Sequence, residues 1–391
     1  MKTTKLMLSA FVAVLAIISC NKQDTTPDMG PKTLKSIEVS LENVILTKGI
    51  VEDAVANGDK ITVNDFQLFL LDINGNEYVG KVTDGSAEAQ SYWGAGLPAD
   101  GKASFHYVDP NCTKVVAVAN MGKQYASYAE LKAELTATPL AIAGQQNPKD
   151  LALYAEDTSF DAAGTHVDNG TDADGNAVQY QQQVFEVDLV LKPRISRFEV
   201  DGFSVIPEDP ANPKYAEVKI TQLAFQNYYP AADLLATEVT TSGALVTPIT
   251  DFSNQSAVYT WLDGIATPNT DWFRDACGIT LNAANDYVQD LPATGKLAYH
   301  AFSTTETPVF VLKLEVDGQP AYLYTKDLKD SNGTVTEFQP GYIYRMSGEG
   351  EVPGSNGTIE IPEEKIDPMD RCLDITVDVM SWEVVLVTPE F

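Results

Sequence analysis

The chain has 391 residues, of which 44% are hydrophobic, and a formal net charge of −29 at pH 7. This hydrophobic fraction is typical of a folding sequence and excludes an acidic disordered protein. The negative field repels nucleic acid and anionic lipid, so neither is an expected partner. A chain of this length predicts two domains.

Residues 1–19 are typical of a bacterial export signal. Lys2 and Lys5 precede a short apolar stretch, residues 6–18, which ends in a small residue and Cys20. The stretch is shorter than the ~20 residues that a membrane-spanning helix needs. The order of branched apolar residue, small residue and cysteine predicts a lipoprotein acylated at Cys20. The alternative is an ordinary secretory signal followed by a chance cysteine.

Residues 20–35 are polar, contain proline and glycine, and predict a tether that holds no core. Residues 36–47 then begin with a clean alternation. Ile37, Val39 and Leu41 lie on one side, and Glu38 and its polar neighbours lie on the other. This period of two predicts a half-buried strand.

The rest of the chain is predicted to be mostly strand. A hairpin is expected at Asn74-Gly75, and one short helix is expected at 128–136, where Ser127 and Glu130 form a capping box. The acidic, glycine-containing stretch 156–176 is interpreted as a long surface loop. Strand-like segments separated by turn residues then indicate two mostly antiparallel β-sandwich domains, residues 36–192 and 193–391.

The residues that carry chemistry are sparse. The only histidines, His106, His166 and His300, are far apart, and no common catalytic motif occurs, so we expect no enzyme and no cofactor. Asp172 and Asp174 fit two positions of a calcium loop. Glycine and glutamine stand where that loop needs its first and last carboxylates, so we expect no metal site.

Three cysteines remain after Cys20, namely Cys112, Cys277 and Cys372. They cannot all pair within one chain, and none lies in a pattern that binds zinc. We therefore expect buried free thiols or at most one disulfide bridge.

Three segments together resemble the fimbrillins of Bacteroidales, the type V pilin family of major and minor fimbrial subunits. The first is the lipobox, tether and alternating strand, followed by Lys48-Gly49. The second comprises residues 113–122, TKVVAVANMG, and residues 192–198, KPRISRF, with Arg194 and Arg197. The third is the C-terminal stretch 373–391, LDITVDVMSWEVVLVTPEF. The resemblance spans essentially the whole chain.

The resemblance implies two transthyretin-like, Greek-key sandwiches, with Arg194 and Arg197 at the domain interface. It also implies an outer-membrane lipoprotein precursor from which a protease removes the lipid, the tether and the first strand. A C-terminal donor strand of a neighbouring subunit then fills the vacated place. The donor residues expected here are Ile375, Val377, Val379, Trp382, Val384, Leu386 and Phe391.

The partners implied are copies of the same chain in a surface fimbrium, accessory or anchor pilins, and a processing protease. Adhesion to host or bacterial surfaces, colonisation and biofilm formation are also implied. The sequence departs from the family at the cleavage position. Well-known members are cut after arginine, whereas the matching residue here is Lys48. Cleavage between Lys48 and Gly49 would need a trypsin-like protease that accepts lysine. Otherwise Lys48 is a turn residue and the uncut subunit is an anchor.

Two other classes of function stay open. The chain could be a surface lipoprotein that binds glycan or protein without polymerising, with Tyr92-Trp93 or Trp272-Phe273 stacking on sugars. It could also be an enzyme of unfamiliar type, although no catalytic constellation supports that reading.

Overall fold

The structure is a computed structural model. It describes residues 35–42, 44–48, 61–78, 81–82, 87–88, 92–93, 102–171, 175–235, 240–264, 272–291, 297–330, 333–347, 358–366, 371–381 and 384–388. The predicted lipidation site Cys20, Gly49 of the predicted cleavage site, and the predicted donor residues Trp382 and Phe391 lie outside these residues. The predictions for Asp172 and Asp174 lie outside them as well.

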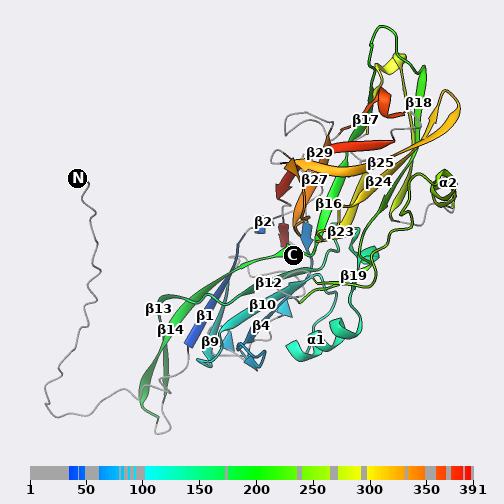
Figure 1. Cartoon of the computed structure of the whole chain (residues 1–391). Coiled ribbons are helices and arrows are strands. Elements are labelled where there is room, and N and C mark those ends of the chain that lie inside the picture. Colours follow the sequence, from blue (N-terminus) through cyan, green and yellow to red (C-terminus); the bar gives the residue numbers. More distant parts are fainter. Residues whose placement is uncertain are drawn as a thin grey trace, which may run out of the picture.

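Two sheets are built from the N-terminal half, in the lower part of Figure 1. One has the order β13-β14-β1-β9-β6-β7, and the other has the order β15-β12-β10-β4-β5 with β8 beside β4. Their strands are β1 Lys35–Glu42, β4 Phe66–Leu71, β5 Glu77–Tyr78, β6 Lys81–Val82, β7 Ala87–Glu88, β8 Tyr92–Trp93, β9 Lys102–Val108, β10 Lys114–Ala119, β12 Leu153–Asp157, β13 Asp161–Thr171, β14 Ala177–Val190 and β15 Lys192–Pro193.

The C-terminal half forms a large sheet in the order β21-β18-β24-β25-β29-β27-β16-β23, with β26 beside β25, and a small sheet β22-β17-β28. The strands are β16 Ile195–Val200, β17 Gly202–Ile206, β18 Glu217–Gln226, β21 Arg274–Asn282, β22 Val288–Asp290, β23 Leu297–Phe302, β24 Val309–Val316, β25 Gln319–Asp330, β26 Gly333–Thr334, β27 Tyr342–Ser347, β28 Thr358–Pro362 and β29 Cys372–Ser381.

Two small sheets join the halves. One is β11-β19-β20, made of β11 Leu140–Ala141, β19 Ala231–Asp233 and β20 Thr240–Ser242. The other is β2-β30-β3, made of β2 Val44–Lys48, β30 Val384–Thr388 and β3 Ile61–Val63. Short 3-10 helices are η2 Ile142–Gln145, η3 Ala283–Asn285 and η5 Glu363–Ile366.

The expectation of a mostly β architecture with packed antiparallel sheets is confirmed by this arrangement. The sheets are nevertheless mixed, because parallel pairs occur at β1 with β14, β16 with β27, β17 with β28 and β25 with β29. Parallel neighbours cannot be joined by a tight turn, so each of these pairs brings together segments that are distant in sequence.

Two of the local predictions are confirmed. Gly75 adopts a positive φ of 84°, and the carboxylate of Asp72 accepts from the backbone N–H groups of Asn74 and Asn76, which closes the turn between β4 and β5. Helix α1 Tyr128–Ala137 begins after Ser127, whose hydroxyl accepts from the backbone N–H of Glu130 at 3.1 Å.

Two other local predictions are wrong. The stretch 156–176 is not a long loop, because most of it forms β13, which pairs with β14 as a hairpin. Its polar, exposed side chains lack the apolar alternation by which a strand is recognised. The structure also contains a second helix, α2 Gln255–Asp263, capped by Asn254. Val258 and Leu262 of α2 pack on Val311 of the large sheet.

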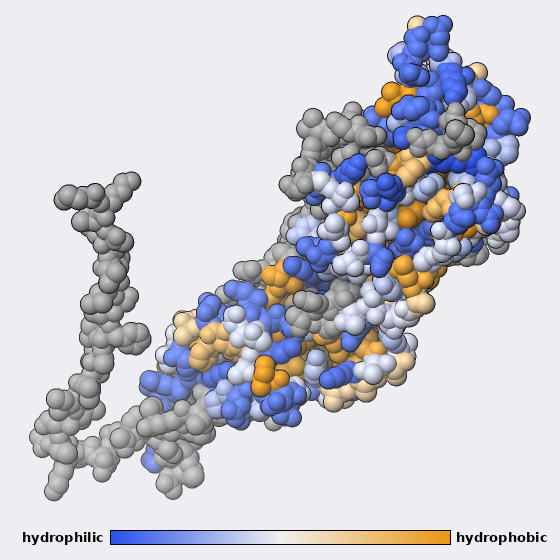
Figure 2. Space-filling view, in the orientation of Figure 1, coloured by the Kyte–Doolittle hydropathy of each residue, from blue (hydrophilic) through white to orange (hydrophobic). Residues whose placement is uncertain are grey.

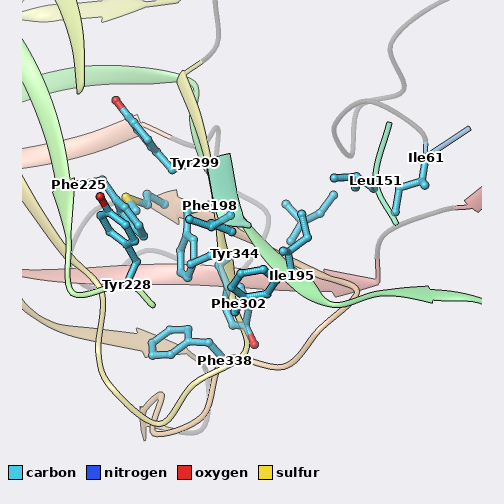
Figure 3. Close-up of a cluster of buried hydrophobic side chains, with 14 of the residues drawn as sticks. Ile61, Leu151, Ile195, Phe198, Phe225, Tyr228, Tyr299, Phe302, Phe338 and Tyr344 are labelled. Carbon is cyan, nitrogen blue, oxygen red and sulfur yellow. The ribbon is translucent and has the colours of Figure 1, made fainter. Parts of the chain in front are cut away.

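One buried hydrophobic cluster runs through both halves of the chain. It contains Ile37, Phe105 and Leu151 from the N-terminal half, and Ile195 and Phe198 from the C-terminal half. Figure 3 shows Leu151 and Ile61 on one side of Ile195 and a group of aromatic rings on the other. Phe198 is central to that group, with ring centroids 5.3–5.8 Å from those of Phe225, Phe310, Phe338 and Tyr344.

The described surface in Figure 2 is mainly hydrophilic, with hydrophobic residues scattered between charged ones. Among the described residues, no helix has the length and apolarity to cross a membrane.

Candidate functional site

The first described strand, β1, lies inside a sheet rather than at its edge. It runs parallel to β14, with Lys35 opposite Gln183 and Glu42 opposite Val190. It runs antiparallel to β9, with Ile37 opposite Phe105 and Val39 opposite Ala103. We call the space that β1 fills between β9 and β14 the β1 slot. Both walls of this slot are separated from β1 by long stretches of sequence.

The floor of the β1 slot is apolar. Ile37 is 0% exposed and Val39 is 2% exposed, and both belong to the main hydrophobic cluster. Leu41, the third residue of the predicted apolar face, is opposite Leu189 in the ladder with β14. Removing β1 would leave two unpaired strand edges and an apolar floor open to water.

The N-terminal end of the slot is polar and buried. Ser36 is 1% exposed and donates its hydroxyl to Oε1 of Gln182 at 2.8 Å, while its Oγ lies 2.8 Å from Nδ1 of His106. The same Gln182 oxygen accepts the backbone N–H of Tyr107. The His106 ring stacks on the His166 ring with centroids 3.7 Å apart. A small hydroxyl at position 36 therefore completes this network.

Lys35 lies at the same end and is also buried. Its ammonium group donates to the carbonyl of Cys112 and lies 4.3 Å from the centre of the Phe160 ring and 5.1 Å from that of Phe185. Burial lowers the pKa of Lys35 from its ordinary value, because loss of water penalises the charged form. Burial likewise raises the pKa of the Cys112 thiol to about 11.

The next strand, β2, carries the predicted cleavage residue Lys48. It pairs in parallel with β30 near the C-terminus, with Val44 opposite Val384 and Lys48 opposite Thr388. Strand β30 also pairs in parallel with β3. The structure therefore brings the predicted cleavage residue beside the predicted donor segment.

The predicted donor residues divide between two strands. Ile375, Val377 and Val379 lie on β29, which is hydrogen-bonded to β25 on one side and to β27 on the other. Val384 and Leu386 lie on β30. Strand β30 is also paired on two sides, but one of its partners, β2, precedes the predicted cleavage site, whereas both partners of β29 follow it.

Of the two arginines predicted at the domain interface, Arg194 contacts the N-terminal half directly, and Arg197 is connected to it through His300. Nε of Arg194 donates to the carbonyl of Leu234 at 2.9 Å, and its guanidinium lies 4.2 Å from the centre of the Tyr154 ring. Nε of Arg197 forms an ion pair with Glu199 at 2.6 Å, and its Nη1 lies 3.1 Å from Nε2 of His300.

His300 connects this pair to the N-terminal half. Its Nδ1 lies 2.6 Å from the carbonyl oxygen of Gln145, and its backbone N–H donates to the side chain of Gln146. Burial, aided by the nearby Arg197 charge, lowers the pKa of His300 to about 3. The ring is therefore neutral, with Nδ1 donating to Gln145 and Nε2 accepting from Arg197.

Other chemistry-bearing groups do not converge. Within the described residues no three His, Cys, Asp or Glu side chains lie together as metal ligands would, and Cys112, Cys277 and Cys372 form no disulfide. Trp272 and Phe273, considered above as sugar-stacking groups, are half-buried. Trp272 packs edge-on against Tyr228 at 4.6 Å between ring centroids.

The sequence did not reveal the buried polar end of the β1 slot. Ser36 falls on the polar side of the alternation, and Lys35 falls at the end of the tether. Their partners Gln182, His106 and Cys112 are remote in sequence. A lysine directly before an alternating strand is the only local signal, and it is a weak one.

No protein-family model matches the chain, and no curated protein matches it. Among solved structures, a putative cell adhesion protein from Parabacteroides distasonis is 12% identical, with 90% of this chain and 98% of that chain covered and a TM-score of 0.49. One from Bacteroides eggerthii is 12% identical, with 92% and 99% covered and a TM-score of 0.45.

A fimbrilin from Porphyromonas gingivalis is 13% identical, with 90% of this chain and 99% of that chain covered and a TM-score of 0.43. These are remote similarities, and each name applies to the solved protein alone. The solved structures to which this chain is similar thus include a fimbrilin and two putative cell adhesion proteins.

Proposed function

We propose that the chain is a structural fimbrial subunit, exported as a lipoprotein and polymerised at the cell surface by strand exchange. In this proposal a protease cuts between Lys48 and Gly49 and frees β1, and a C-terminal segment of the next subunit fills the β1 slot. The observation that carries the proposal is the position of β1, which lies between β14 and β9 and is joined to neither by a turn.

The connectivity makes β1 replaceable. A strand joined to its neighbour by a hairpin cannot be exchanged without opening the hairpin. Strand β1 contacts its two neighbours through the sheet ladders, through side-chain packing and through the hydrogen bonds of Ser36 and Ser40, and no hairpin joins it to either. A strand from another molecule can therefore take its place without any change in the connections of the acceptor, which is β-augmentation at an internal position.

The energetics also favour occupancy of the slot. Burying side chains such as Ile37 and Val39 stabilises the sheet by roughly 1.5–3 kcal/mol each, and the two open edges would otherwise expose unpaired backbone groups. A processed subunit with an empty slot is therefore unstable until a donor strand binds. This instability drives assembly toward a fibre.

The position of β30 supports a C-terminal donor. Its residues 384–388 belong to a small sheet with β2 and β3 and not to the large sheet that holds β29. Loss of β2 after cleavage would remove one of the two partners of β30. We therefore assign the exchanging segment to the residues after the body of β29. The similar solved structures include a fimbrilin and putative cell adhesion proteins. A role in adhesion would be exerted by the assembled fibre.

The test is the state of the protein sheared from cells. We expect an N-terminus at Gly49 and a ladder of oligomers on gels of unboiled samples that collapses on boiling. Lys48→Gln should abolish both, because the protease loses its cationic recognition residue. Lys60→Gln, which changes another lysine in the same stretch before β3, should behave as wild type.

Two results would contradict the proposal. One is a wild-type monomer that keeps a blocked, acylated Cys20. The other is a ladder that persists unchanged in Lys48→Gln with the original N-terminus intact. The first would favour a non-polymerising surface lipoprotein or an uncut anchor subunit.

A further inference from the structure

The chain carries a second copy of the pattern of its own first strand. Residues 35–42 have the sequence KSIEVSLE, and residues 380–387 have the sequence MSWEVVLV. Four of the eight aligned positions are identical. They are Ser36 with Ser381, Glu38 with Glu383, Val39 with Val384, and Leu41 with Leu386.

We propose that residues 380–391 of one copy occupy the β1 slot of the next copy in this register, and that Met380 replaces the buried Lys35. This inference rests on the proposed function and adds the register and the side-chain contacts. The occupant is a second copy of the chain, and each donor side chain meets the partners of its counterpart in β1.

The serine is the most specific match. In β1 only a small hydroxyl fits between Gln182 and His106, and Ser36 is 1% exposed there. In the proposed register Ser381 brings the same group to the same two partners. A shift of the donor by two residues in either direction would instead place Val379 or Glu383 against them. A valine would leave both buried polar groups unpaired, which is destabilising.

The apolar floor is matched as well. Trp382, Val384 and Leu386 take the positions of Ile37, Val39 and Leu41. A shift by one residue would turn these side chains to the opposite face of the sheet and put Glu383 on the apolar floor. The hydrophobic pattern and the serine therefore select the same register.

The replacement of Lys35 by Met380 removes a buried charge and its hydrogen bond to the Cys112 carbonyl from this end of the slot. The Lys35 ammonium group is held beside Phe160 and Phe185 at the cost of lost hydration. A methionine carries no charge into this pocket, and its sulfur makes favourable contacts with aromatic rings. Exchange would thus replace a desolvated ammonium group by an apolar side chain that contacts the same rings.

The end of the slot near Ser40 loses a hydrogen bond when the donor replaces β1. Ser40 of β1 donates its hydroxyl to Asp188, and Val385 stands in its place in the donor. Release of the donor breaks two pairs at the end of β29, those of Met380 and Ser381 with β27, and the ladder of β30 with β3. The body of β29 stays in its own sheet.

A pair of cysteines tests the register in the full exported chain. Glu38 is opposite Ser104 of β9, so Glu383 of a donor should be opposite Ser104 of its acceptor. We expect Ser104→Cys combined with Glu383→Cys to give a ladder that survives boiling without reductant and collapses with it. Cross-strand neighbours lie close enough for a disulfide. Ser104→Cys combined with Val385→Cys, which reports a shift of two residues, should give no such ladder.

The outcomes separate the two proposals. A boiling-resistant ladder from the Val385→Cys pair and none from the Glu383→Cys pair would overturn the register and leave strand exchange standing. No boiling-resistant ladder from either pair, in fibres whose unboiled samples still show oligomers, would also overturn the register. The absence of oligomers in unboiled wild-type samples would overturn both proposals. The single variants control for the native cysteines.

A second variant tests the Lys35 pocket. Met380→Glu brings a carboxylate against the Cys112 carbonyl and the two aromatic rings that now surround the Lys35 ammonium group, and we expect the amount of oligomer that survives unboiled gel conditions to fall about tenfold. Met380→Leu keeps an apolar side chain and should retain the ladder. Equal ladders in Met380→Glu and wild type would show that residue 380 does not enter this pocket.

Discussion

Individual residues at the junction of the two halves are held by buried polar contacts. Glu199 is 0% exposed and accepts from both Arg197 and Arg345. Arg197 in turn donates to His300, and the ring of His300 donates to Gln145. A buried network of this kind is stable only if every member is paired. The neutral form of His300 is therefore part of the fold.

The protonation of His300 should make the protein less stable in acid. Its pKa is about 3 in the folded state against 6.5 ordinarily, so below pH 6.5 the unfolded chain binds a proton that the folded chain excludes. Stability is then present above pH 6.5 and is lost as the pH falls toward 3. This single group contributes a slope of up to about 1.4 kcal/mol per pH unit.

His300→Gln checks this prediction. Urea unfolding of wild type and variant between pH 6.5 and 4.5 should show a smaller loss of stability with acid in the variant. The comparison of slopes removes the contribution of the carboxylates, which both proteins share. Parallel curves would mean that His300 is not the group responsible.

At the scale of single elements, α1 shows how a local pattern is enough to define a helix start. Ser127 caps the helix through the backbone N–H of Glu130, and the Glu130 carboxylate accepts the backbone N–H of Ala126. Only Leu131 and Leu135 of the helix are buried. With so small a buried face, the cap supplies a sizeable part of the stability of α1.

We expect Ser127→Ala to lower the free energy of unfolding by about 1 kcal/mol, because one backbone donor of the first turn loses its partner. Ser127→Asp should keep most of that stability, since aspartate also caps helices. Thr136→Ala, a change of similar size within the same helix, serves as the control and should not destabilise. A Ser127→Ala midpoint equal to that of wild type would refute the assigned cap.

For the whole molecule, the continuous core predicts one cooperative unfolding transition instead of two. The main hydrophobic cluster contains residues from both halves, and the sheets β11-β19-β20 and β2-β30-β3 cross between them. Fluorescence, far-UV circular dichroism and calorimetry should therefore give the same midpoint.

Leu151→Ala gives a sharper test of this coupling. Leu151 is 0% exposed and lies where the cluster passes between the halves (Figure 3). The substitution should cost about 2–5 kcal/mol and shift the signals of both halves together. A transition that splits into two, with only one half affected, would show that the halves fold independently.

A strand, a turn and a helix start could be predicted from the sequence, because the signal for each one is local. The alternation at Ile37 and Val39, the Asn74-Gly75 turn and the Ser127 cap each rest on a few neighbouring residues, and the structure has all three. Where the signal was weak, the prediction failed, as at β13 with its exposed polar side chains and at α2, which lacks a capping box.

Which distant segments meet is known only from the folded chain. Sequence alternation cannot state that β1 lies between β9 and β14, that β29 is an interior strand, or that Ser36 meets His106 and Gln182. Parallel pairing and buried polar contacts join residues that share no local pattern, because their free energy comes from the assembled sheet and not from neighbours along the chain.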